Sequence, residues 1–182
     1  MRRAPLAALV AGLLTLFPLL LSAAGPPPDT AEGMTNETLD GLIRRLGEAV
    51  EGGAGVWRFR IEGRPVTVIT DEKADRMRIL VPVAEVASLP EGRLQRLMQA
   101  NFDSALDARY AIAKGLLWSA FIHPLGALSD HEFLSGLGQT VNLAITYGSS
   151  YSSGALVFGG GDSQALQRRE LIRQLIEKGL AI

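Results

Sequence analysis

The amino-acid sequence predicts an α+β protein in which helices pack on one face of an antiparallel sheet. Two observations carry this prediction. Apolar residues recur every three to four positions in some segments, as in amphipathic helices, and every second position in others, as in half-buried strands. The strand-type segments also follow one another across short turns, which favours antiparallel pairing. The predicted order is α-β-β-β-α-β-β-α, with a five-stranded sheet and an appended C-terminal helix.

The composition limits the kinds of function. The chain has 182 residues, of which 47% are hydrophobic, and this suits one compact domain with extensions. It contains no cysteine, which excludes disulfides, thiol catalysis and cysteine-based metal sites. Its 18 Lys and Arg residues nearly balance its 19 Asp and Glu residues, whereas a general nucleic-acid binder would carry a net basic field. We therefore expect no nucleic-acid partner.

Residues 1–24 have the pattern of a secretory signal peptide. Two arginines are followed by an apolar run over residues 6–21 and by small residues at 22–24, which suit a cleavage site. The alternative is an uncleaved membrane anchor, but the run is short for a span of about 20 residues and Pro18 interrupts it. We expect an exported protein, periplasmic or secreted, that meets a membrane only if this segment stays attached.

A linker and a first helix are predicted next. Residues 25–34 are polar and rich in proline, so we expect no fixed structure there. Thr35 is a suitable N-cap, and the glycine-rich residues 51–55 are expected to end the helix. Apolar residues at three- and four-residue spacing give this helix one buried stripe, made of Leu39, Leu42, Ile43, Leu46 and Val50.

Three strands are then predicted to form an antiparallel meander. Apolar and charged residues alternate over residues 57–61 and 76–83, and residues 66–70 continue the pattern between them. Turns are predicted at residues 63–65 and 71–75. One face of these strands is apolar and the other is partly charged, which indicates that helices cover only one side of the sheet.

The next segments predict a helix and a β-hairpin. Ser88 and Glu91 match a capping box that would begin the helix. Residues 109–113 and 116–125 alternate as strands, and the Lys114-Gly115 turn between them allows the positive φ of a two-residue hairpin. The apolar side of the helix is made of Leu94, Leu97, Met98 and Phe102.

Two more helices complete the predicted fold. Ser129 and Glu132 match a second capping box. Residues 148–162 form a Ser/Gly-rich connector to a C-terminal helix over residues 163–182. We expect this last helix to pack on its own domain; the alternative is exchange onto a partner subunit. The buried stripe of the helix before the connector is made of Leu134, Leu137, Val141 and Ala144.

The order of these segments resembles the type III secretion chaperone-like fold and, within it, the YbjN-type proteins. The likeness is carried by DRMRILVPV, LQRLMQANF and ARYAI…GLLWSAFIHPLGALSDHEF, and it spans roughly residues 35–147. The order and spacing of the segments give it, with no diagnostic motif. The resemblance implies a small non-enzymatic protein, commonly a homodimer. It also implies that an extended client segment binds against apolar patches of the sheet and helices.

Three groups of residues could suggest a chemical site. His123 and His131 lie outside any ligand-spaced motif, so we expect structural or surface roles for them. The serines at 149–153 lack the G-x-S-x-G context of a nucleophile and fit a connector. Residues 159–162 could present main-chain N–H groups to an anion, but they lack the lysine of a P-loop. We therefore expect no catalytic, metal-binding or cofactor-binding residues.

Four arginines are the first candidates for partner binding. Arg58 and Arg60 are two residues apart on one predicted strand, and Arg76 and Arg78 are two apart on another. Each pair must therefore project from one face of its strand. If both strands turn these faces outward, the sheet carries a basic surface. That surface is either a solvated face that keeps the protein soluble or a site that binds an anion or an acidic peptide.

Two aromatic residues are the other candidates for partner binding. Trp118 and Phe121 have opposite parity on one predicted strand, so a regular strand turns one of them away from the helices. An aromatic side chain on the outer face would mark a dimer or client surface.

The sequence thus predicts an exported, non-enzymatic protein- or peptide-binding module, chaperone-like or regulatory, that forms a homodimer. The alternatives are an envelope structural or interaction protein and a small hydrolase, although no constellation of residues supports the hydrolase.

Overall fold

The computed structural model describes residues 33–103, 105–147 and 163–181. Contacts divide the chain between Thr30 and Ala31, and every described residue belongs to the second unit. The predicted signal peptide and nearly all of the predicted linker and connector lie outside the described residues. The helices are α1 (Asn36–Leu46), α2 (Arg93–Asp103), α3 (Asp130–Ile145) and α4 (Ser163–Leu180), with a 3₁₀ turn at Val86–Ser88.

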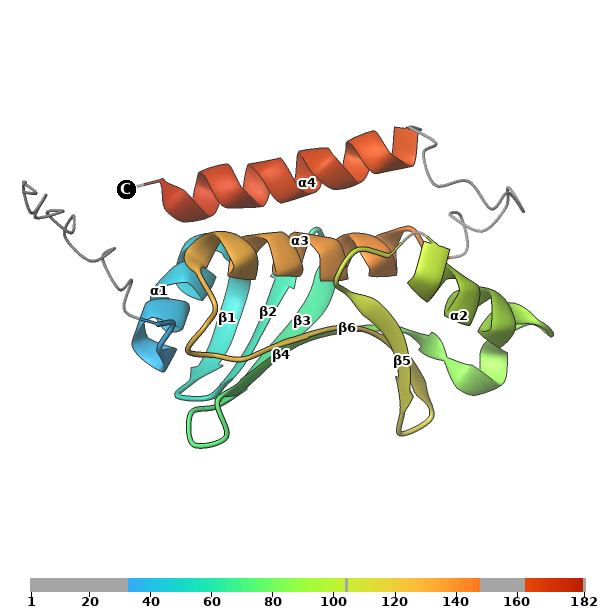
Figure 1. The fold of residues 1–182 in the computed structure, drawn as a ribbon, viewed down its shortest axis with the longest axis horizontal. Helices are drawn as coiled ribbons and strands as arrows, with labels where there is room; N and C mark the ends of the chain where they lie inside the picture. Colours follow the sequence, from blue (N-terminus) through green and yellow to red (C-terminus); the bar gives the residue numbers. More distant parts are fainter. Residues whose placement is uncertain (1–32, 104, 148–162, 182) are drawn as a thin grey trace, which may run out of the picture. The chain divides into compact units, whose positions relative to one another are not determined.

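The strands form one antiparallel sheet in the order β1-β2-β3-β4-β6-β5 (Figure 1). Helix α3 packs on β4 and β6, and α1 packs beside β1. Figure 1 shows these helices on one side of the sheet, called here the inner face, and no helix over the opposite or outer face. The predicted α+β class is confirmed. The strands are β1 (Glu48–Gly53), β2 (Val56–Ile61), β3 (Arg64–Asp71), β4 (Arg76–Glu85), β5 (Arg109–Ala113) and β6 (Leu116–His123).

Alternation along the strands builds the core. In β2, Trp57, Phe59 and Ile61 are buried, whereas Arg58 and Arg60 are exposed. Four residues of the predicted stripe lie on α1 over this apolar face and are at most 2% exposed, whereas the fifth, Val50, belongs to β1. Removal of this apolar surface from water supplies the main driving force for folding.

The prediction of five strands is wrong, because β1 forms a sixth. Helix α1 ends where Gly47 turns into an extended conformation and donates its N–H to the Ile43 carbonyl. The residues that follow pair with β2 through a register shift, and Ala49 has a φ of 51°. The segment EAVEGG has neither alternation nor strong strand propensity, so only pairing with β2 makes it a strand.

Two of the three predicted helix caps are confirmed. The Thr35 hydroxyl accepts a hydrogen bond from the Thr38 N–H, and so it caps α1. Ser129 and Glu132 form the reciprocal capping box of α3. The third prediction is wrong. Ser88 donates its hydroxyl to the carbonyl of Glu85, and α2 starts only at residue 93, because Gly92 has a φ of 72° that a helix does not allow.

The predicted hairpin between β5 and β6 is confirmed. Lys114 and Gly115 have φ angles of 52° and 74°, and Ala113 pairs with Leu116 across them. Positive φ at both central residues is the signature of a type I′ turn, whose twist matches that of the two strands.

Helix α4 forms a layer beyond α3, and α3 is consequently buried on two sides. A Cβ atom added at Gly138 would come within 2.8 Å of Ile172, so glycine allows the two helices to approach closely. The last turn of α4 is tied to α1. Arg45 Nε donates to the Gly179 carbonyl at 3.1 Å, and Lys178 Nζ donates to the Leu46 carbonyl at 3.2 Å.

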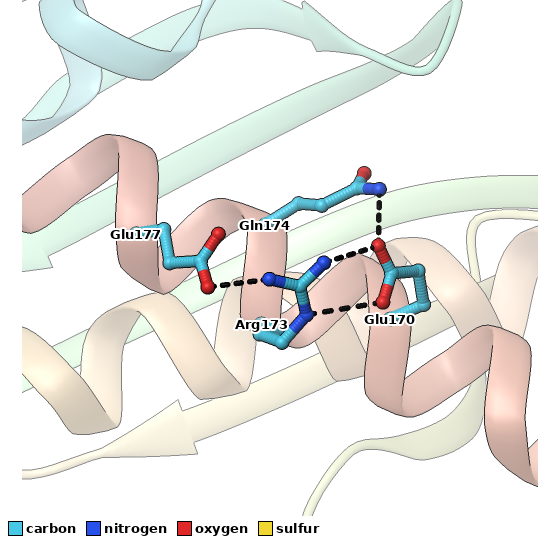
Figure 2. A network of polar contacts seen from close by, with 4 residues as sticks. All are labelled: Glu170, Arg173, Gln174 and Glu177. Atoms are coloured by element: carbon cyan, nitrogen blue, oxygen red, sulfur yellow. Dashed lines mark hydrogen bonds and ion pairs between the residues drawn. The ribbon is translucent and has the colours of Figure 1, made fainter.

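An exposed ion-pair network lies on α4. Figure 2 shows Arg173 between Glu170 and Glu177, with ion-pair distances of 2.6 and 2.5 Å. The hydrogen bond from Arg173 lowers the pKa of the Glu170 carboxyl, and a second one from Gln174 adds to the effect. Such solvated pairs contribute little stability, so the packing of α4 on α3 is what holds the helix in place. Among the described residues, no helix is long and apolar enough to cross a membrane.

Candidate binding surface on the sheet

The strand register places the four candidate arginines on the outer face. Arg58 lies directly opposite Thr67, and Thr67 lies opposite Leu80. Residues opposite one another in adjacent strands share a face, and every second residue of a strand lies on that same face. Arg60 on β2 therefore projects with Arg58, and Arg76 and Arg78 on β4 project with Leu80. All four side chains are exposed.

Apolar side chains lie between these arginines. Arg78 stands between Ile69 of β3 and Ile122 of β6 in one row across the sheet. Ile69 is 37% exposed and Ile122 is 58% exposed. Exposed isoleucine beside arginine gives the outer face a mixed basic and apolar character, unlike a surface that serves only solubility.

The charges of the four arginines are not neutralised within the described part of the chain. The ion pairs there involve Arg44 and Arg173 and none of these four. Arg60 donates to the Gly63 carbonyl at 3.0 Å, and Arg76 donates to the Asp75 carbonyl at 3.5 Å. A guanidinium has five N–H donors, so each arginine keeps most of its capacity to bind a carboxylate.

Acidic residues appear at one edge of the outer face. Glu51 lies opposite Arg58, and Glu48 lies opposite Arg60, on the edge strand β1. Neither pair is close enough to count as an ion pair among the described residues. Asp71 at the end of β3 also lies opposite Arg76 without forming an ion pair with it, so carboxylates border the basic region of β2, β3 and β4 at two places.

The two aromatic candidates lie on opposite faces, as their parity requires. Trp118 lies on the outer face, half-buried, and its indole N–H donates to the Ala113 carbonyl at 3.1 Å. Phe121 lies on the inner face and is only 5% exposed. Its ring packs against Gly136 of α3, where an added Cβ would be 2.8 Å from the ring. Only Trp118 is therefore available to a partner on the outer face.

Several outer-face residues were not singled out from the sequence. Ile69, Ile122 and Leu80 belong there, and Arg109 of β5 joins them because it lies opposite Ala120. The sequence could have placed Ile122 on the same face as Trp118, because the two residues are four positions apart on one strand. Nothing in the sequence places Arg109 near Ile122, because that depends on the register between β5 and β6.

A second exposed surface lies on α2 and β5. Leu94, Met98 and Phe102 recur every four residues on α2 and are 39%, 51% and 75% exposed. They share a face, as the sequence indicates, but only Leu97 of the predicted stripe is buried. Two neighbouring apolar residues in the sequence are similarly exposed, namely Leu106 at 49% and Ile112 at 50%.

The histidines show no arrangement for metal binding. The Nδ1 atom of His123 is 2.8 Å from the Pro124 carbonyl, and its ring stacks on Phe121 with centroids 5.9 Å apart. His131 is exposed. In the described part of the chain, no group of three or more His, Asp or Glu side chains could hold a metal ion.

Comparisons with known proteins show the fold. No family model matches the sequence, and no curated protein matches it. A chain of the ExsC–ExsE complex superposes with a TM-score of 0.52 at 16% sequence identity, over 66% of this chain and 95% of that one. A chain of the HopA1–SchA chaperone–effector complex gives a TM-score of 0.48 at 14% identity, over 61% and 90%. The chain has a type III secretion chaperone-like fold, with six strands in its sheet.

Proposed function

We propose that the protein is a non-enzymatic module that binds an extended acidic and apolar segment of another polypeptide on the outer face of its sheet. One observation carries this proposal. Four arginines without ion-pair partners among the described residues alternate with exposed isoleucines on a face that no helix covers. The ExsC–ExsE structure, which has a similar fold, is itself a complex.

The chemistry of this face selects the kind of segment. Guanidinium groups bind carboxylates through charge-assisted, often bidentate, hydrogen bonds. Between Ile69 and Ile122, Arg78 offers such a contact next to apolar surface, and Trp118 adds a rigid aromatic edge. A segment in which acidic and aliphatic residues alternate can satisfy both kinds of contact, whereas a basic segment would be repelled.

The test uses a synthetic peptide in which glutamate alternates with valine, with a lysine-for-glutamate peptide as its counterpart. The four substitutions Arg58→Gln, Arg60→Gln, Arg76→Gln and Arg78→Gln should together weaken glutamate-peptide binding by about tenfold or more, as measured by calorimetry. The fold should persist, as judged by circular dichroism. If the four substitutions leave the dissociation constant of the glutamate peptide unchanged, the proposal is wrong.

A control separates the outer face from general charge. The pair Arg58→Gln and Arg78→Gln removes two positive charges from the face, and the pair Lys73→Gln and Lys114→Gln removes two from exposed turns. Only the arginine pair should weaken binding strongly. Equal weakening by both pairs would mean that the peptide senses net charge alone.

We also propose that two copies associate through the apolar surface of α2 and β5. Symmetric homodimers bury one self-complementary patch from each copy. Leu94, Met98 and Phe102 lie on one helix face and supply such a patch. Phe102→Glu should convert a dimer to a monomer in sedimentation, and Arg96→Glu, at an exposed position about 120° around the same helix from Phe102, should not. A monomeric native protein at micromolar concentration would rule this out.

Export is the remaining part of the proposal. It is supported by the charged start, apolar run and small residues of segment 1–24. Mass determination of the protein recovered from cells should give a chain that begins at Gly25. A chain that retains its first residues would favour the anchor instead.

A further inference from the structure

The sheet has a gap in its pairing at the end of β6. The pairing of β5 with β6 ends where Arg109 lies opposite Ala120, yet β6 continues to His123. Before β5 the chain is held by α3 instead. The Gln139 side-chain oxygen accepts hydrogen bonds from the main-chain N–H groups of Asp107 at 2.8 Å and Ala108 at 3.3 Å. On the β5 side, no described strand therefore lies beside the last three residues of β6, whereas β4 pairs with them on the other side.

The direction of the open main chain follows from a contact on β5. Asn101 accepts from the Tyr110 N–H at 2.7 Å and donates to the Tyr110 carbonyl at 3.1 Å. Tyr110 thus turns its main-chain groups away from β6. Because these groups alternate in direction, those of Ala120 face β5, and those of Ile122, two residues on, face the gap. Apart from the pairing of β6 with β4, the main chain of Ile122 forms no hydrogen bond among the described residues.

A hollow of about 550 Å³ lies beside this stretch of β6. Arg109 and Ile122 line it from the sheet, His123 from the end of β6, and Ser135 and Gln139 from α3. The unpaired main chain of β6 at Ile122 therefore faces a hollow that has room for another strand.

The two edge strands are less open. On β5, the Asn101 side chain already occupies the main-chain groups of Tyr110. On β1, Arg44 donates to the Gly52 carbonyl at 3.2 Å, and the register shift disturbs the edge. Blocked and irregular edges discourage the addition of a strand. By the same alternation Ile112 of β5 turns its main-chain groups away from β6, so this edge is open there, and the gap at Ile122 is favoured because the hollow adjoins it.

We propose that the bound segment adds a short antiparallel strand to β6 in this hollow, in line with β5. This inference rests on the proposed function and names where an extended segment is anchored. The segment residue opposite Ile122 exchanges main-chain hydrogen bonds with it and points to the outer face. There Arg78 lies next to Ile122 and Arg109 lines the same hollow, so an acidic side chain fits. The residues before and after it point towards Ser135 and Gln139, next to Asp107 and Glu132, so small uncharged side chains fit that position.

Main-chain methylation of the glutamate–valine peptide tests this arrangement. N-methylation of the glutamates removes the N–H groups that would face β6, and N-methylation of the valines removes those that would face away. The first peptide should bind on the order of tenfold more weakly than the unmodified one, and the second should bind within about threefold of it. Equal loss with both peptides would overturn strand addition.

Filling the hollow gives a second test. Ser135→Trp places a large side chain in the hollow, and Gln174→Trp places one on the exposed side of α4 as a control. Only Ser135→Trp should weaken the unmodified peptide. In the wild-type complex, hydrogen exchange at the Ile122 amide should slow by at least about tenfold.

The outcomes separate this inference from the proposed function. If the arginine substitutions weaken binding, but Ser135→Trp and both methylated peptides do not, the outer-face function stands and the strand site is wrong. If the unmodified peptide does not bind the wild-type protein at all, the proposed function fails, and the strand site fails with it.

Discussion

The inner and outer faces of the sheet are made by the same strands but are built on different principles. On the inner face, Trp57, Ile79 and Leu117 are fully buried, and α1 and α3 cover them. On the outer face, residues one position away, such as Arg58, Arg78 and Trp118, stay in contact with solvent. Substitutions on the inner face should therefore alter stability, and those on the outer face should alter binding.

The largest expected effect lies at the centre of the inner face. Trp57→Ala leaves a cavity in a fully buried position and removes the indole donor to Asp40, which is 2.8 Å away. We expect a loss of about 3–5 kcal/mol in the free energy of unfolding. Trp118→Ala on the outer face should cost less than about 1.5 kcal/mol. Urea unfolding followed by circular dichroism measures both. Similar losses would mean that the two faces do not differ as described.

The next effect comes from the close approach of α3 to the inner face. In Gly136→Ala the new Cβ would lie 2.8 Å from Cε1 of Phe121, and the overpacking should cost about 1–3 kcal/mol. Gly41→Ala on α1 is the matched control, because the nearest atom there is 3.9 Å away. That variant should gain about 0.5–1 kcal/mol from helix propensity. Thermal unfolding that shifts both variants the same way would contradict this account.

A smaller effect depends on pH. The hydrogen bond from Arg44, and next that from Trp57, lower the pKa of the Asp40 carboxyl. A carboxyl whose pKa is lower in the folded state contributes stability above its unfolded pKa, near 3.8, and loses it as the pH falls through the folded pKa. Asp40→Asn should thus cost less than about 1 kcal/mol at neutral pH, because the pair is partly exposed.

The measurement for Asp40 is the free energy of unfolding from pH 7 to pH 2. The wild-type protein should lose its advantage over Asp40→Asn as the solution becomes acidic. Parallel curves for the two proteins would show that the Asp40 contacts do not titrate with folding.

The smallest effect on stability is expected on the outer face. Arg58→Gln and Arg78→Gln remove exposed groups that form no ion pair among the described residues. Each should change the free energy of unfolding by less than about 0.5 kcal/mol, although together they weaken peptide binding. A large destabilisation in urea would show that these arginines support the fold.

Local patterns determined how much of this structure was predictable. The alternation in VWRFRI assigns each residue of β2 to a face, and the Ser129–Glu132 capping box marks the start of α3. Strand β1 was not predictable, because its residues lack alternation and only pairing with β2 holds them. The sequence likewise places Arg58 and Arg60 on one face of β2, but it does not give the register between strands that relates them to Arg78 of β4.

The hollow beside β6 was beyond sequence reasoning. It forms because Gln139 binds the main chain of Asp107, 32 residues earlier. Such a contact produces no periodic pattern in the sequence, because a single amide side chain on α3 holds the chain away from β6 just before β5. The exposure of Phe102 was equally hidden, because the apolar spacing on α2 is that of a buried helix.

The hydrogen bonds that tie α4 to α1 bear on the order of events in folding. They join residues 134 and 132 positions apart in the chain. Contacts of such long sequence separation carry a high loop-closure entropy and form slowly. Since α4 follows α3 in the chain, we expect the sheet and α3 to pack before α4 covers them. We therefore expect α4 to dock last, and the partly folded chain to be most prone to aggregation before α4 docks.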